Sequence, residues 1–225
     1  MSAEAHFNPR LFQFLRQLKR HNERAWFQDN KARYVADVQQ PMLRFIADFA
    51  PPLAKISRHY EADARPVGGS MFRIHRDTRF SKDKSPYKTH ASAHFRHKQA
   101  SKDVHAPGFY FHLEPGECFI GAGIWRPEPP VLRRIRDAIS YDEPGWRRVR
   151  RKTPDIEGEQ QVRVPSGYDA DHTFIDDLKR KSYFASMSFS EAEVCGNGFL
   201  DACATACKSY APLMAFLTEA VDLEW

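Results

Sequence analysis

The residues best suited to chemistry lie in one segment, residues 71–90, which reads MFRIHRDTRFSKDKSPYKTH. This basic segment contains six cations and only two carboxylates, Asp77 and Asp83. The cations are Arg73, Arg76, Arg79, Lys82, Lys84 and Lys88. Cations held close together repel one another unless an anion lies among them. The segment therefore predicts a site for a small anionic ligand that carries a phosphate or a carboxylate, with arginine giving bidentate geometry and lysine a point charge.

The first residues of the basic segment alternate as a half-buried strand does. Phe72, Ile74 and Arg76 share one face, whereas Arg73 and His75 share the other. If Phe72 and Ile74 face the core, Arg76 lies at its edge, where a guanidinium requires a carboxylate or a bound oxyanion. The alternative is a solvated basic loop whose two carboxylates pair with its own cations.

Six of the ten histidines lie between His75 and His112. His90 and His94 fall on one face of a predicted strand, and three imidazoles can hold a catalytic zinc ion. The histidine intervals match no metal motif and the nearby cations would repel a divalent ion, so we expect no metal and no cofactor. A single histidine acting as acid or base, His75 or His90, is the stronger prediction, because imidazole titrates near neutrality. Asp77 is a further acid–base candidate.

Common catalytic signatures are absent from the sequence. It contains no glycine-rich nucleotide loop, no Gly-x-Ser-x-Gly elbow and no His-Glu-x-x-His motif. Ser81 and Ser85 lie among lysines and could form a Ser–Lys nucleophile, although both suit turn capping better. Whether the protein is an enzyme acting on its ligand stays open.

Aromatic residues near the basic segment support a second hypothesis, a nucleic-acid-binding module. Tyr87, Phe95, Tyr110 and Phe111 could stack on bases. A second run of cations, residues 147–152, could follow a phosphate backbone. The simpler expectation is that most of these rings are core residues and that the second run is a solvated helix surface.

Length and composition limit the class of protein. A chain of 225 residues, 42% of them hydrophobic, can bury a sizeable core, and a net charge of +5 permits anionic partners. No apolar run is long enough to span a membrane and the first residues show no export signal, so we expect a cytoplasmic protein without membrane contact. The four cysteines form no Cys-x-x-Cys pair and are expected to be buried thiols.

Helical patterns occupy the first third and the last half of the chain. An amphipathic helix is predicted over residues 7–19, with Asn8 as its cap and Pro9 in its first turn. A second helix is expected from Asn22, with a restart at Pro41 and an end at residues 51–52, Pro-Pro. Later helices are predicted near residues 131–139, 146–149, 174–179 and 199–221, the last interrupted at Pro212.

Strand patterns occupy the middle of the chain. They are predicted over residues 71–76, 90–97, 108–113, 118–125 and 183–189. Residues 114–117, EPGE, read as a tight hairpin, and Gly121 and Gly123 mark a bulge or a close approach of another group. We predict one α+β domain over residues 1–225, with a mainly antiparallel sheet of about four to six strands packed by N-terminal and C-terminal helices.

Several stretches resemble a known family. RIHRDTRFSKDKSPYKTH is similar to the hallmark of the bacterial family of uncharacterised proteins termed domain of unknown function 2461. NERAWFQDNKARY, FYFHLEPGECFIGAGIWRPEP with LRRIRDAI, and VPSGYDADHTFIDDLKRKSY agree, so the resemblance spans about residues 10–215. It implies a single cytoplasmic α+β domain and carries over no catalytic or binding residue. Because they occur in these stretches, Trp26, Lys31 and Trp125 are expected as walls of the anion site.

Overall fold

Five strands form one antiparallel sheet in the computed structural model, which describes residues 4–100 and 106–225. The strands lie side by side in chain order and are β1 (Tyr60–Glu61), β2 (Ala91–His97), β3 (Gly108–Glu114), β4 (Glu117–Ile124) and β5 (Tyr183–Phe189). The tight hairpin is confirmed, since Glu114 pairs with Glu117 and Gly116 between them has a φ of 84°. A two-residue connection of this kind makes β3 and β4 antiparallel neighbours.

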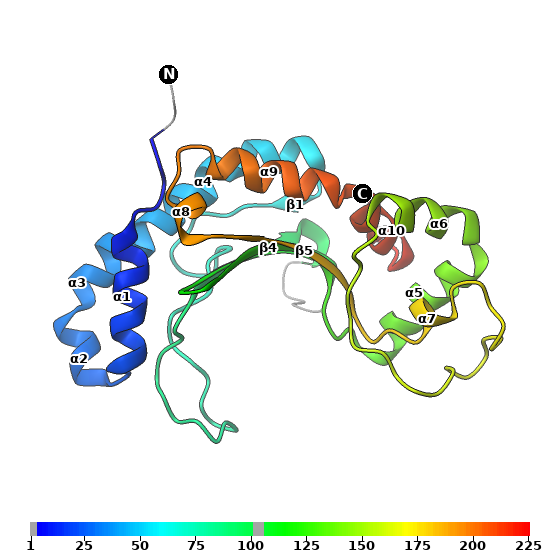
Figure 1. Ribbon diagram of the computed structural model, residues 1–225, viewed down its shortest axis with the longest axis horizontal. Helices are drawn as coiled ribbons and strands as arrows, with labels where there is room; N and C mark the ends of the chain where they lie inside the picture. The colour runs from blue at the N-terminus through cyan, green and yellow to red at the C-terminus, as the bar shows by residue number, and fades with distance from the viewer. Residues whose placement is uncertain (1–3, 101–105) are drawn as a thin grey trace.

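Helices pack on one face of this sheet and beside its ends, and the predicted α+β class is confirmed (Figure 1). The α-helices of the described ranges are α1 (Pro9–Arg20), α2 (Arg24–Asp29), α3 (Lys31–Tyr34), α4 (Gln40–Ile56), α5 (Pro129–Tyr141), α6 (Glu143–Lys152), α7 (Ile175–Leu178), α8 (Glu191–Val194), α9 (Phe199–Ser209) and α10 (Ala211–Ala220). α4 and α9 lie over the sheet, and Pro212 in the first turn of α10 marks the predicted interruption. No helix within the described ranges has the length and apolar character needed to cross a bilayer.

The N-terminal helices begin where their capping residues predict. The Asn8 side chain accepts a hydrogen bond from the Arg10 amide at 2.9 Å, and Pro9 is the first residue of α1. The second predicted helix is divided into α2, α3 and α4. A π-helical turn, Val35–Gln39, precedes α4, and Pro41 follows in the first turn of that helix, which agrees with the expected restart.

The predicted helix end at Pro51 and Pro52 is wrong, because α4 continues through both prolines to Ile56. Each proline lacks an amide donor and so removes one intrahelical hydrogen bond. Phe49 and Leu53 lie on either side of the prolines and are both fully buried. Tertiary packing of this apolar face therefore keeps the helix continuous despite the missing bonds.

The two faces of the sheet differ in what covers them. Phe109, Phe111 and Leu113 of β3 point into the core, and the Phe111 ring stacks on Phe45 of α4 at 4.6 Å. The intervening Tyr110, together with the other even-numbered residues of β3, points to the opposite side. We call this opposite side the open face.

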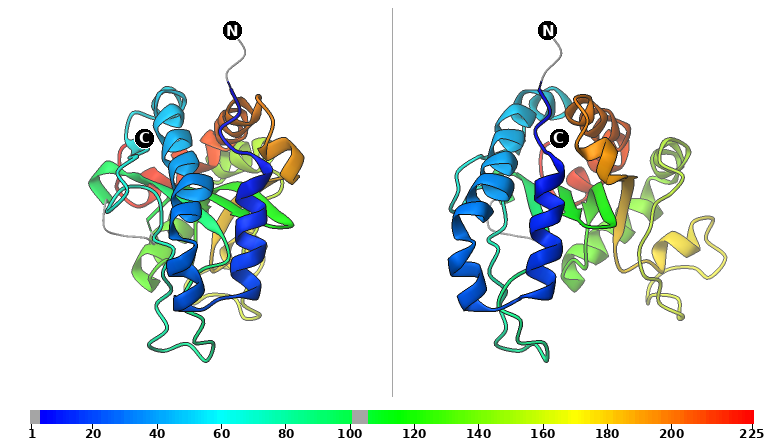
Figure 2. Two further views of the ribbon diagram at one scale, coloured as in Figure 1. Left: turned by 90° about the vertical axis from the view of Figure 1, so that its left-hand side faces the viewer. Right: turned by 60° about the vertical axis from the view of Figure 1, so that its left-hand side comes forward.

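The strand predicted over residues 71–76 is wrong, since only isolated bridges occur there. The Phe72 amide donates to the Ser92 carbonyl of β2 at 2.9 Å. Two residues later the partner changes, and the Lys88 amide donates to the Ile74 carbonyl at 2.8 Å. Because the pairing moves from β2 to the returning limb of the same segment, no continuous ladder forms. The tip of the basic segment projects beyond the N-terminal helices (Figures 1 and 2).

Candidate functional site

The open face carries a groove of about 780 Å³. Its lining combines aromatic rings with glycines, small side chains and two carboxylates, Glu117 and Glu157, and rings of this kind suit a small organic ligand. The rings that line it are Phe72, His94, Tyr110, Phe119, Trp125 and Phe184. Several are in mutual contact, with centroids of Tyr110 and Phe119 5.8 Å apart and those of Trp125 and Phe184 5.1 Å apart. The predicted wall residue Trp125 thus belongs to the groove.

Glycines form part of the groove floor. A Cβ on Gly108 would lie 2.1 Å from His94 Nε2, so glycine at this position lets the His94 ring lie against the backbone of β3. Gly123 has a φ of 144°, and a Cβ there would lie 2.1 Å from the Tyr183 carbonyl oxygen. The contact at Gly123 accords with the close approach predicted for the glycines of β4.

The returning limb of the basic segment is anchored to the N-terminal helices. The Asn22 side chain accepts a hydrogen bond from the Tyr87 amide at 3.0 Å and donates one to the Tyr87 carbonyl at 2.9 Å. The Tyr87 ring stacks on Phe27 at 4.1 Å and is buried. This anchor fixes the backbone position of Lys88, the next residue along the chain.

Three of the six predicted cations are engaged within the basic segment. Arg76 pairs with Asp83, Arg79 pairs with Asp77 at 2.6 Å, and the Lys84 ammonium donates to the Thr78 carbonyl at 2.9 Å. Hydrogen bonds from Arg79 lower the pKa of Asp77 to about 2. The pKa of Asp83 is lowered by Ser85 first and by Arg76 second. These internal pairs are those expected of the solvated-loop alternative.

The other three cations have different surroundings. The Lys88 ammonium is half-buried and lies 5.0 Å from the centroid of the Phe72 ring. Burial first, and the charge of Arg73 second, lower the pKa of Lys88. Arg73 and Lys82 are exposed. Within residues 4–100 and 106–225, none of these three side chains forms an ion pair.

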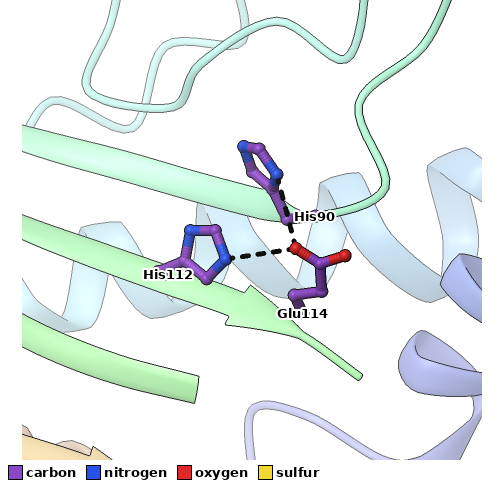
Figure 3. A group of neighbouring side chains, drawn as sticks. All are labelled: His90, His112 and Glu114. Atoms are coloured by element: carbon purple, nitrogen blue, oxygen red, sulfur yellow. Dashed lines mark ion pairs between the residues drawn. The ribbon is translucent and has the colours of Figure 1, made fainter. Parts of the chain in front are cut away.

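A second cluster lies where the open face meets the start of β2, and it joins His90, His112 and Glu114 (Figure 3). Glu114 Oε2 lies 3.6 Å from His112 Nε2 and 3.9 Å from His90 Nδ1. The two imidazole centroids are 4.5 Å apart. The His112 ring also stacks on Phe119 at 5.0 Å, so this cluster adjoins the groove.

Burial keeps both imidazoles of this cluster neutral at neutral pH. Burial first, and His112 second, lower the pKa of His90 to about 4 against the opposing charge of Glu114. Burial also lowers the pKa of His112, although Glu117 and Glu114 oppose that shift. A neutral imidazole can accept a proton or bind a metal ion through an unprotonated nitrogen.

The remaining sequence candidates lie away from these groups. His75 is exposed and contacts Phe27 and Tyr87, whereas His90 contacts a second imidazole and a carboxylate. Trp26 stacks on His21 at 5.9 Å among the N-terminal helices, and it does not line the groove; nor does the exposed Lys31.

The aromatic residues of the nucleic-acid hypothesis are mostly core residues. Tyr87, Phe95 and Phe111 are buried, and Tyr110 alone of the four lines the groove. The second run of cations lies on α6, where contacts engage part of it: Arg150 lies 3.5 Å from Asp177, and Arg147 lies over an aromatic ring. Three of the four predicted stacking rings are therefore not accessible to bases.

Sequence reasoning missed His112 and Glu114. They lie two residues apart in FYFHLE, on the face of β3 opposite to Phe111 and Leu113. The β2–β3 register, in which Ala91 pairs with Leu113, places His90 beside them. A register deduced from the hairpin pattern could have found the cluster, whereas intervals between histidines could not.

The fold and the site define an α+β protein with a ring-lined groove on the face of its sheet opposite to the buried phenylalanines of β3. A family model described as "Conserved hypothetical protein (DUF2461)" matches residues 10–216. The chain therefore belongs to this family, and the resemblance noted in its sequence is confirmed. No match was found among the curated proteins or among the solved structures.

Proposed function

We propose that the protein binds a small anionic ligand in the open-face groove and that Lys88 and Arg73 hold its phosphate or carboxylate. The observation that carries this proposal is the state of Lys88. Its ammonium is half-buried over Phe72, a groove residue, and pairs with no carboxylate of the described chain. A bound anion would offset both the burial of this charge and its repulsion by Arg73. Each charge-assisted hydrogen bond would contribute about 1.5–3 kcal/mol.

The acidic residues of the basic segment support an external partner for Lys88. Asp77 and Asp83 are both engaged by arginines of the segment. Neither carboxylate of the segment is therefore free for Lys88, and an anion from solution would supply a partner. Arg76, Arg79, Lys82 and Lys84 help to give the basic segment a net positive charge, which would accelerate the approach of an anionic ligand. Of the six cations that the sequence predicts as ligand-binding residues, this proposal assigns direct contacts to two, Lys88 and Arg73.

The groove suits an apolar or planar portion of the ligand. Its volume of about 780 Å³ falls in the range typical of small-molecule sites. Phe72, Tyr110 and Phe119 offer ring faces, and the glycines of β3 and β4 leave room above the sheet. The ligand class we propose is therefore an aromatic or heteroaromatic compound with one phosphate or carboxylate, as in a mononucleotide.

Any chemistry on this ligand would use His90 for proton transfer. Among the acid–base candidates, His90 lies two residues from Lys88 and contacts the carboxylate of Glu114. His75 is exposed, and Asp77 is held by Arg79. Turnover would require the ligand to reach from Lys88 to His90 along the groove edge.

The proposal includes a cytoplasmic location. Cys118, Cys195, Cys203 and Cys207 are all free thiols, and burial raises the pKa of the Cys203 thiol. Unpaired buried thiols are typical of proteins in reducing compartments.

The experiment is a thermal-shift screen of mononucleotides, sugar phosphates and aromatic carboxylates, followed by calorimetric titration of the best compound. The wild type is expected to gain several degrees with saturable binding. Lys88→Met keeps the apolar stem and removes the charge, and it should weaken binding at least tenfold. Lys208→Met removes an exposed lysine from α9, on the covered face, and should bind as the wild type does.

Three results would contradict the proposal. They are a screen without any stabilising compound, equal binding by Lys88→Met, and equal losses in Lys88→Met and Lys208→Met. Binding of a single-stranded oligonucleotide that falls steeply with salt and ignores Lys88→Met would favour a nucleic-acid-binding module instead.

A further inference from the structure

Two nitrogens and one carboxylate oxygen converge at the edge of the open face (Figure 3). The ligand atoms of His90, His112 and Glu114 all lie within 4.8 Å of one another. We infer that these three residues bind one divalent transition-metal ion. The inference stands whether or not a ligand occupies the groove, but a metal ion bound to His90 would replace the proton-transfer role proposed for that imidazole.

The state of His112 is the first argument for a metal. This residue is only 8% exposed, and its Nε2 atom is buried without a hydrogen-bond partner in the described chain. A buried polar atom without a partner is costly unless something binds it. Glu114 Oε2 lies 3.6 Å from this atom, which is too far for a hydrogen bond. A metal ion between the two atoms would satisfy both.

The orientation of the side chains is the second argument. The opposite nitrogen of the ring, His112 Nδ1, is hydrogen-bonded to the Tyr110 hydroxyl at 3.1 Å. A hydrogen bond on the far nitrogen is how metal-binding histidines are usually oriented. Glu114 is held in the same manner, since its Oε1 accepts a hydrogen bond from Thr89 at 2.9 Å while Oε2 faces both imidazoles.

The donor set decides the class of metal. Two imidazoles and one carboxylate suit zinc, iron(II) or cobalt(II), whereas magnesium and calcium prefer oxygen ligands throughout. Ligand atoms around a four-coordinate zinc lie about 3.4 Å apart, given bond lengths near 2.1 Å. The two distances from Glu114 Oε2, 3.6 and 3.9 Å, exceed this by only a few tenths of an ångström. A metal ion would draw the three ligand atoms, now within 4.8 Å of one another, closer together and leave a fourth position open.

Charges around the cluster moderate its affinity. Lys88 and Arg76 act on His90 electrostatically, and Lys19 lies 3.6 Å from Glu114 Oε1. Glu117 opposes them from the neighbouring strand by acting on His112. From the sequence we expect no metal, because the histidine intervals match no metal motif and the nearby cations would repel a divalent ion. This expectation leaves out the two carboxylates that β3 and β4 contribute, Glu114 and Glu117.

The test is a titration of the untagged, metal-free full-length protein with cobalt(II), monitored by visible absorption. We expect one equivalent to bind with an absorption band typical of four- or five-coordinate cobalt, and zinc to displace it. Glu114→Gln retains the shape of the side chain and should weaken binding at least tenfold. Tyr110→Phe should weaken it by about ten- to a hundredfold through loss of the orienting hydrogen bond.

Two further variants separate loss of a ligand from loss of the fold. His90→Ala removes a half-buried ligand and should lose the visible band while its circular dichroism stays native. His75→Ala removes an exposed histidine outside the cluster and should bind cobalt as the wild type does. Wild type that binds no cobalt at about 1 mM would overturn the inference, as would a native band in Glu114→Gln or His90→Ala.

Discussion

We predict that the folded protein loses stability in mild acid because of His94, and the structure allows the loss in free energy of unfolding to be worked out. His94 lines the groove, is 8% exposed and stacks on Phe72 at 6.4 Å. Burial first, and the charge of Arg96 second, lower the pKa of this imidazole from 6.5 to about 4. In the unfolded chain the imidazole titrates at its ordinary value. The perturbation is a change from pH 7 to pH 5.

The sign follows from proton uptake. Between pH 6.5 and 4 the unfolded state binds a proton at His94 that the native state does not, so stability falls as the pH is lowered. At pH 5 nearly all unfolded chains carry this proton and about a tenth of the native molecules do, which corresponds to a loss of roughly 2 kcal/mol from this one residue. For a chain of this size the loss lowers Tm by about 4–8 °C.

The assay is urea denaturation of the wild type and of His94→Gln at both pH values. Glutamine does not titrate, so the variant should lose roughly 2 kcal/mol less than the wild type between pH 7 and pH 5. Other groups, His90 among them, contribute equally to both proteins and cancel in the difference. Identical pH dependence in the two proteins would refute the burial argument for His94.

Three smaller predictions concern packing. Gly108→Ala places a Cβ 2.1 Å from His94 Nε2, so we expect a loss of about 1–3 kcal/mol in a denaturation experiment, and an unchanged midpoint would show that the ring moves freely. Asn22→Ala removes both hydrogen bonds to Tyr87 and should speed protease cleavage within the basic segment; cleavage at the wild-type rate would argue against the anchor. Cys207 is fully buried, which raises the pKa of its thiol, so native protein should resist alkylation there at pH 8, and rapid labelling would contradict that burial.

Much of the fold could be predicted because its elements carry local signals. Apolar spacing with Asn8 and Pro9 predicted α1, and the EPGE turn predicted the β3–β4 hairpin. The errors arose where tertiary contacts outweigh local preference. Packing of Phe49 and Leu53 carries α4 past two prolines, and the alternating residues 71–76 lack one continuous strand partner.

The candidate site was predictable only in part for the same reason. The cations of the basic segment were found by composition, but their pairing depends on how the segment folds back. Asp83 forms an ion pair with Arg76 across the tip of the basic segment. The hydrogen bonds between Asn22 and Tyr87 fix the neighbouring Lys88 beside Phe72, at the edge of the groove. The cluster of His112 and its neighbours depends on strand register, which histidine spacing does not report.

The central claim is that Lys88 binds the anionic group of a ligand. The pKa of its side chain tests this most directly. Nuclear magnetic resonance of the labelled ε-amine can follow its titration in the free protein and at saturation with the compound that gives the largest thermal shift. We predict a pKa below the ordinary lysine value in the free protein, because the ammonium is half-buried beside Arg73, and a rise when the anion binds. An ordinary value in the free protein, or a lowered value that the anion leaves unchanged, would contradict the account.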